Sequence, residues 1–197
     1  MDNSIIPIIK ELERIYDALA IKFEIKHVRP VITIQTKGRV KILGWHSADR
    51  WEQENKTIGE INICAENLKD NPIETLVHEM SHHINSCEKI EDCNLAGYHN
   101  VEFKKRAESL GLIVEKMGRH GWAKTSVSDK LQEVLKEIKP DTNTFKLYRI
   151  PNLRFVNPTK MKKYSCGCTT VRCAVELNAK CLNCNNNFLK QEEKNDN

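Results

Sequence analysis

The chain has 197 residues, of which 40% are hydrophobic and 29% charged, and its net charge is +4. This length accommodates one domain of ordinary size and a small additional unit, and the composition excludes a disordered protein. No apolar run approaches the roughly 20 residues that span a bilayer. The first residues lack a basic region followed by an apolar stretch. We therefore expect a cytoplasmic protein without a membrane partner, with nucleoid association as an option.

Charge and cysteines are unevenly distributed. Residues 1–140 carry 21 Lys/Arg and 22 Asp/Glu, whereas residues 141–190 carry nine Lys/Arg and two Asp/Glu, a net charge of +7. In a reducing compartment, the eight cysteines are better explained by metal ligands and free thiols than by disulfides.

The first half of the chain predicts one helix and three strands. Apolar residues recur at helical spacing in residues 4–20. Residues 31–36 and 39–45 have strand character, and Lys37-Gly38 between them predicts a tight hairpin. Residues 59–64 alternate apolar and polar side chains, which predicts a third strand.

The second half predicts three more helices. One begins at Pro72, with Asn71 as its N-cap and Glu74 completing a capping box. After an irregular stretch at 86–97, helices are expected at 100–110 and 128–138, with a glycine-containing loop at 118–121 between them. Prolines and basic residues after 140 predict an extended connector.

The helix that begins at Pro72 contains the pattern His-Glu-x-x-His. His78 and His82 are four residues apart, so both imidazoles project from one helix face and can bind the same metal ion. Glu79 flanks the open side of that metal, where a metallopeptidase places its general base. A chance grouping on a solvated helix face is the alternative, but Val77 beside His78 belongs to an apolar helix.

A catalytic zinc site needs a third protein ligand and leaves the fourth position for water. His99 is the candidate, because it opens the next helix four residues before Phe103 on the expected apolar face. Spacing alone leaves alternatives open, which are a helix-capping role for His99 and ligands from His83, Glu88, Glu91 or Glu102. Tyr98 is a candidate for stabilising an oxyanion.

Two close cysteine pairs near the C-terminus predict a zinc ribbon. Cys166 and Cys168 are separated by twelve residues from Cys181 and Cys184, and four thiolates can close a structural tetrahedral site. The first pair is one residue tighter than a usual knuckle, and Cys173 is a competing ligand. Unliganded thiols are the alternative. However, so short a segment with little apolar content needs a bound metal ion or another crosslink to fold.

These motifs resemble the SprT-like family, which includes the DNA–protein crosslink protease Spartan. The resemblance is carried by His78-Glu-Met-Ser-His82, by Gly97-Tyr98-His99-Asn100 with the helix that follows, and by the C-terminal cysteines. It implies an α+β, zincin-like metallopeptidase domain with a small mixed sheet, followed by a zinc ribbon. It also maps the third zinc ligand onto His99.

We therefore expect four regions: a SprT-like peptidase domain at 1–140, a basic connector at 141–160, a zinc ribbon at 161–190 and a disordered tail at 191–197. The expected cofactors are one catalytic and one structural zinc ion. The expected function is hydrolysis of proteins associated with or crosslinked to DNA, with proteins and single-stranded or crosslink-bearing DNA as partners. The candidate DNA contacts are Lys160, Lys162, Lys163 and Arg172. The alternatives are a non-catalytic, nucleic-acid-binding zinc protein of the transcription-associated type and a metallopeptidase without a nucleic-acid role.

Overall fold

A computed structural model describes residues 3–36, 42–150 and 161–191. The chain divides into two compact units, Met1–Asn152 and Leu153–Asn197. Several expectations fall outside the described residues: the turn at 37–38, the first part of the strand at 39–45, connector residues 151–160 with Lys160, and the tail from 192.

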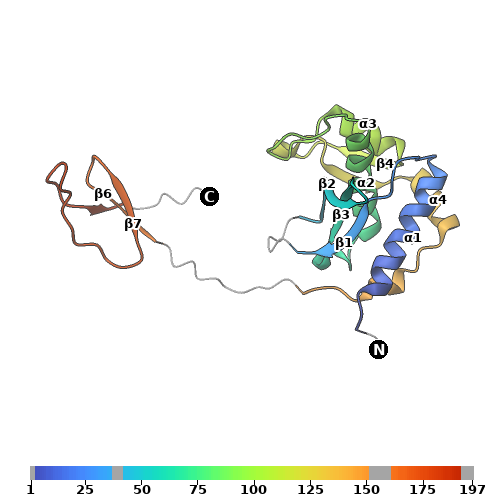
Figure 1. Ribbon diagram of the computed structural model, residues 1–197, viewed down its shortest axis with the longest axis horizontal. Coiled ribbons are helices and arrows are strands. Elements are labelled where there is room, and N and C mark those ends of the chain that lie inside the picture. Colours follow the sequence, from blue (N-terminus) through green and yellow to red (C-terminus); the bar gives the residue numbers. More distant parts are fainter. Residues whose placement is uncertain (1–2, 37–41, 151–160, 192–197) are drawn as a thin grey trace. The chain divides into compact units, whose positions relative to one another are not determined.

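The first unit is a mixed α+β assembly (Figure 1). Its regular elements are, in chain order, α1 (Ile6–Lys22), β1 (Val31–Gln35), β2 (Gly44–Gln53), β3 (Lys56–Cys64), the 3-10 helix η1 (Ala65–Asn67), α2 (Pro72–Cys87), α3 (Val101–Ser109), β4 (Leu112–Glu115), η2 (Gly118–His120), β5 (Lys124–Val127), α4 (Asp129–Ile138) and η3 (Thr142–Lys146).

The core of this unit lies between the helices and one face of the three-stranded sheet. Helix α1 buries residues at helical spacing, including Ile8, Leu12 and Leu19. They meet Leu76, Val77, Met80 and Ile84 of α2, and the inner face of β3 through Ile61 and Ile63. Because α2 packs directly on β2 and β3, any side chain on its flank is held at a defined distance from the sheet.

The sheet has the strand order β1-β3-β2, which corrects the expected hairpin. Strand β1 pairs in parallel with β3, and β2 pairs antiparallel with β3 on its other side. The hairpin is instead β2–β3, turning at Glu54 and Asn55 with φ of 51° and 61°, the positive values that a two-residue type I′ turn needs. The prediction failed because parallel pairing joins strands distant in the sequence, and because a Glu-Asn pair is a weak turn signal.

Helix α2 begins where expected, but the predicted capping box is wrong. The side chain of Asn71 makes no capping hydrogen bond, although Pro72 occupies the first helical turn. Glu74 accepts a hydrogen bond from the Thr125 hydroxyl of β5 at 2.9 Å instead of reaching back to the N-cap. The hydrogen bond from Thr125 of a distant strand therefore replaces the expected bond between Glu74 and the start of its own helix.

Helices α3 and α4 follow the sequence more closely. Asn100 caps α3 through hydrogen bonds from Glu102 and Phe103, and Ser128 caps α4. The antiparallel pair β4–β5, between these helices, was not expected from the sequence. Beyond residue 140 the chain is not extended at first, because η3 buries Phe145 against the core.

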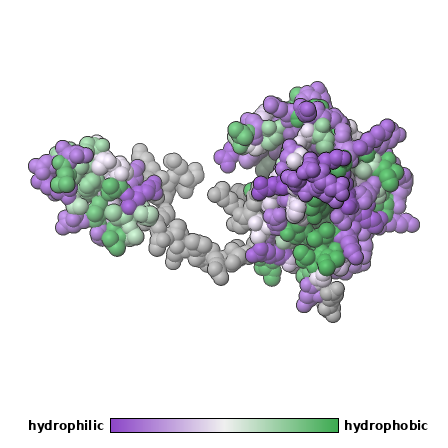
Figure 2. All heavy atoms as spheres, in the orientation of Figure 1, coloured by the Kyte–Doolittle hydropathy of each residue, from purple (hydrophilic) through white to green (hydrophobic). Residues whose placement is uncertain are grey.

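The second unit contains the three-stranded sheet β7-β6-β8, formed by β6 (Lys162–Ser165), β7 (Thr170–Cys173) and β8 (Leu189–Lys190). Tyr164 is buried, whereas Val175, Leu182 and Leu189 are 71%, 99% and 66% exposed. Figure 2 shows hydrophobic atoms on the visible surface of this unit. A unit of this size with so few buried apolar side chains requires a bound metal ion or another crosslink to remain folded.

Across the described ranges of the chain, no helix combines the length and apolar character needed to cross a membrane.

Candidate metal centres

Three imidazoles converge on the flank of helix α2. His78 and His82 project from the helix, and the Nε2 atom of His99 lies 3.3 Å from Nε2 of His78 and 3.1 Å from Nε2 of His82. The ring of Phe103 packs beneath all three, with centroid distances of 4.6 Å to each. The three residues form one of two groups in the described chain that could hold a metal ion.

The position of His99 is set by backbone contacts with the segment around η2. Its N–H donates to the carbonyl of His120 at 3.0 Å, and its carbonyl accepts from the N–H of Trp122 at 3.0 Å. Gly121, between these two partners, has φ +69°, and a Cβ atom there would lie 2.2 Å from the His99 carbonyl oxygen. Only glycine therefore permits this close approach.

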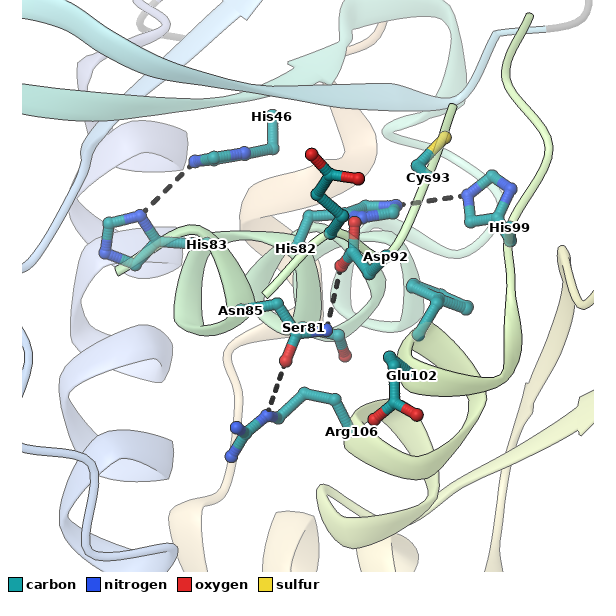
Figure 3. Close-up of polar contacts among 12 residues, drawn as sticks. His46, Ser81, His82, His83, Asn85, Asp92, Cys93, His99, Glu102 and Arg106 are labelled. Atoms are coloured by element: carbon teal, nitrogen blue, oxygen red, sulfur yellow. Dashed lines mark hydrogen bonds and ion pairs between the residues drawn. The ribbon is translucent and has the colours of Figure 1, made fainter. Parts of the chain in front are cut away.

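A buried carboxylate orients His82. Asp92, 8% exposed, lies with Oδ2 2.9 Å from Nδ1 of His82. The same oxygen accepts from the Asn85 amide at 2.8 Å, and Asn85 in turn accepts from Arg106 of α3 at 2.9 Å (Figure 3). Because the carboxylate holds the proton on Nδ1, the Nε2 lone pair of His82 faces the other two imidazoles.

A second polar chain orients His78. The Thr125 hydroxyl donates to Glu74 at 2.9 Å, so its oxygen can accept from Nδ1–H of His78, 3.5 Å away. This arrangement again leaves the Nε2 lone pair directed at the centre. The sequence analysis missed Asp92 and Thr125, because contacts from a loop and a distant strand leave no periodic signal. It also missed Asn85 of α2, whose role depends on its contact with Asp92.

The histidine pKa values reflect burial and these partners. Burial, followed by His82 and His99, lowers the pKa of His78 well below its usual range. Burial and then His82 lower the pKa of His99 to about 4. Burial also acts to lower the pKa of His82, but the hydrogen bond with Asp92 and the charges of Glu79 and Asp92 outweigh it and raise that pKa. The lowered pKa values keep His78 and His99 neutral and available as metal ligands.

The three histidines open into a cleft of about 460 Å³. Glu79 lines it and is 5% exposed. The start of β2 forms the opposite wall, and a Cβ atom on Gly44 would lie 2.7 Å from Thr75 Cγ2 and 3.2 Å from Glu79 Cγ. The strand therefore lies against the helix at the point where Glu79 projects.

His46 of β2 also lines the cleft, and sequence reasoning gave no sign of it. Its Nε2 lies 3.4 Å from Nδ1 of His83, while His83 Nε2 donates to the carbonyl of Val28 at 2.8 Å (Figure 3). Neutral His83 therefore accepts at Nδ1, and His46 is the donor. Burial, followed by His83 and His82, lowers the pKa of His46 to about 4.

The competing ligands are outside the three-histidine group. His83 faces β2 and Val28 rather than the three imidazoles. Glu88 pairs with Arg106 and Glu102 with Lys105, while Glu91 is exposed at the cleft. The ring of Tyr98 lies against Gly121, and Tyr98 is not among the described residues that line the cleft.

The second group that could hold a metal ion is formed by Cys166, Cys168, Cys181 and Cys184. The Sγ atom of Cys168 lies 3.5 Å from that of Cys166 and 3.6 Å from that of Cys181. Backbone N–H groups of Cys184 and Asn183 lower the pKa of the Cys181 thiol to about 6. Cys173 pairs in register with Lys162 and is outside the group.

Cys64, Cys87 and Cys93 also lie outside both groups.

The described candidate DNA contacts differ in their surroundings. Lys162 pairs with Glu176, which also accepts from the Tyr164 hydroxyl. Lys163 and Arg172 are direct partners in the antiparallel register of β6 and β7, so their side chains share one face of the sheet.

These features define a mixed α+β protein with a three-histidine group in an open cleft and a separate four-cysteine group. Comparisons of the chain with protein-family models, curated proteins and solved structures each gave no match.

Proposed function

We propose that this protein is a zinc metallopeptidase of the SprT-like type, with a zincin-like catalytic unit, that hydrolyses proteins associated with or crosslinked to DNA. The observation that carries the proposal is the convergence of three imidazole Nε2 atoms beside Glu79 in an open cleft. A purely structural metal site is closed by four protein ligands, whereas a catalytic one keeps a position open.

The donor sets favour zinc in both places. Nitrogen ligands 2.0–2.1 Å from a tetrahedral zinc ion are about 3.3 Å apart, and sulfur ligands at 2.3 Å are about 3.8 Å apart. The observed nitrogen separations are 3.1 and 3.3 Å, and two of the sulfur separations are 3.5 and 3.6 Å. His78, His82 and His99 would hold the catalytic ion, and the four cysteines would hold the structural one.

Zinc in the histidine site would supply Lewis acidity toward a peptide carbonyl and acidify a water molecule. Glu79 accepts the proton of the attacking water and returns it to the leaving amine. Asp92 and Thr125 keep the imidazoles of His82 and His78 in the tautomer that presents Nε2. Packing of Phe103 beneath the three rings limits their rotation.

Strand β2 provides a surface for the substrate backbone. It lies at one edge of the sheet order β1-β3-β2, and Gly44 and His46 of this strand line the cleft. A protein segment added to this edge would be held by main-chain hydrogen bonds. Recognition of the backbone places few requirements on most side chains of the substrate.

The basic character of residues 141–190 supports a nucleic-acid partner. Cations on one face of a small unit bind phosphates and release counterions. Lys163 and Arg172, which are paired on one face of β6 and β7, are the described residues best placed for this contact.

The proposal is tested by cleavage of a protein crosslinked to single-stranded DNA. Glu79→Gln is expected to retain zinc and the fold and to lose at least about 100-fold in rate, because it removes only the proton acceptor. Glu102→Gln, which changes a partly exposed carboxylate on α3 paired with Lys105, is the matched control and should cleave normally.

Three outcomes would redirect the assignment. Wild-type activity in Glu79→Gln would remove Glu79 as the base. Cleavage of free protein without any DNA affinity would indicate a metallopeptidase without a nucleic-acid role. DNA binding with no hydrolysis of any protein would indicate a non-catalytic zinc protein.

A further inference from the structure

The face of the sheet opposite helix α2 carries a second pocket. His46 points from β2 toward α2 (Figure 3), so its neighbours Trp45 and Ser47 face the other side of the sheet. There they border a pocket of about 620 Å³ whose lining includes Trp51, Gln35 and Glu60. The pocket and the histidine cleft share strand β2 as a common wall.

Glu60 is a buried carboxylate in this pocket. It is 5% exposed and lies on β3 between Val31 of β1 and Ser47 of β2. Its oxygens accept hydrogen bonds from the Trp51 indole N–H at 2.7 Å, the Thr33 hydroxyl at 3.2 Å and the Gln35 amide at 3.4 Å. The Trp51 indole and the Gln35 amide nitrogen can only donate, whereas the Thr33 hydroxyl has a single proton and its oxygen also lies 3.0 Å from Oδ1 of Asn62.

No lysine or arginine forms an ion pair with Glu60 in the described ranges of the chain. Arg50 borders the pocket, but it is exposed on the outer part of β2. Burial of a carboxylate without a cation is costly even when neutral donors surround it. A ligand with positive charge would add an ion pair to the neutral donors that the described residues provide.

A bulge in β2 sets the aromatic wall of the pocket. The register with β3 shifts between Ser47 and Trp51, so that Trp51 pairs with Ile58 and lies on the same face as Glu60. Trp51 is 45% exposed although its indole N–H is bonded to the carboxylate. An exposed aromatic face beside a negative charge suits an alkyl ammonium or guanidinium group.

We propose that this pocket binds a lysine or arginine side chain of a protein segment lying along the edge of β2. Successive side chains of an added strand point to opposite faces of the sheet. One residue of the segment would thus face the three histidines, and an adjacent one would face Glu60 and the tryptophans. The pocket deepens the proposed peptidase function, on which it rests, by selecting a basic residue next to the scissile position.

The test is calorimetric titration of full-length, zinc-loaded Glu79→Gln protein with two extended peptides. The peptides differ at one position, which is lysine in one and norleucine in the other. Norleucine keeps the apolar stem and removes the charge. The lysine peptide is expected to bind roughly 5- to 30-fold more tightly than the norleucine peptide. A second substitution in the same protein, Glu60→Gln, should abolish this difference. Glu52→Gln, which removes an exposed carboxylate from the same strand, should preserve it.

Trp51→Leu provides an independent variant, because it removes the aromatic wall and keeps the carboxylate. It should reduce the lysine preference even if Glu60→Gln is too unstable to titrate. Equal binding of the two peptides, or a full preference in both pocket variants, would overturn the proposal.

Wild-type hydrolysis separates this proposal from the proposed function. Cleavage without a basic preference would refute the pocket and retain the peptidase. Selective binding of the lysine peptide without hydrolysis by the wild type would retain the pocket as a binding site and refute the peptidase.

Discussion

Asp92 accepts a hydrogen bond from Nδ1 of His82 across 2.9 Å, and both side chains are almost enclosed. The carboxylate comes from the loop after α2, and the imidazole from the helix itself. This contact fixes both the orientation of the ring and the nitrogen that carries its proton. It therefore couples the loop that leads to His99 with the helix that supplies the other two histidines.

Asp92→Asn should weaken zinc binding in the histidine site by about 10- to 100-fold, the usual effect of losing a carboxylate partner of a metal-bound histidine. Competition with a chromophoric chelator measures this affinity. Glu102→Gln is the control and should leave it unchanged. Unaltered affinity in Asp92→Asn would show that the contact does not orient His82.

Elemental analysis should find two zinc ions per chain, because each donor group is complete without the other. His82→Ala should leave one ion, and Cys181→Ser should leave the other. Loss of both ions in either variant, with the rest of the protein still folded, would contradict independent sites.

Gly121→Ala should destabilise the first unit by about 1–3 kcal/mol, the usual cost of overpacking, because the added Cβ would meet the His99 carbonyl oxygen at 2.2 Å. It should also weaken zinc binding by displacing His99. Gly118→Ala is a matched control, since its φ is also positive at +46° but nothing lies within 4 Å of an added Cβ. Chemical denaturation and zinc titration of the two variants provide the comparison.

The lowered pKa of His46, about 4 compared with 6.5 in the absence of perturbation, predicts a pH-dependent stability. Between pH 6.5 and 4 the unfolded chain binds a proton at this position and the folded protein does not. The stabilising contribution is therefore fully present above pH 6.5 and is lost as pH falls through this range. Between pH 6.5 and 4, the melting temperature of His46→Gln should fall less than that of the wild type. Equal decreases in the two proteins would contradict the burial of a neutral His46.

The DNA contact is expected on the face shared by Lys163 and Arg172. Neutralising both should flatten the logarithmic salt dependence of single-stranded DNA binding by about 1.4 units, at roughly 0.7 per phosphate contact. Lys162→Gln alone removes a single cation and should flatten the slope by at most about 0.7 units. An unchanged slope in the double variant would place the DNA contact outside this face.

The sequence by itself determined the local features of the candidate sites. The spacing of His78 and His82 places both on one flank of α2 because helical geometry is periodic. The apolar spacing of α1 is likewise local and appears in the structure as expected. The helices expected at 100–110 and 128–138 also form, although their caps at Asn100 and Ser128 were not predicted. The four cysteines of the second unit also come together as their spacing predicts.

Only the tertiary structure decided which distant groups meet these motifs. His99 reaches the other histidines because residues 120–122 hold its backbone on both sides, and Asp92, Thr125 and His46 arrive from a loop and two strands. The parallel pairing of β1 with β3 placed β2 at the sheet edge and Glu60 beneath Trp51. Such pairings join residues far apart in the chain, so their free energy depends on the packing of the whole unit, and no short sequence window contains it.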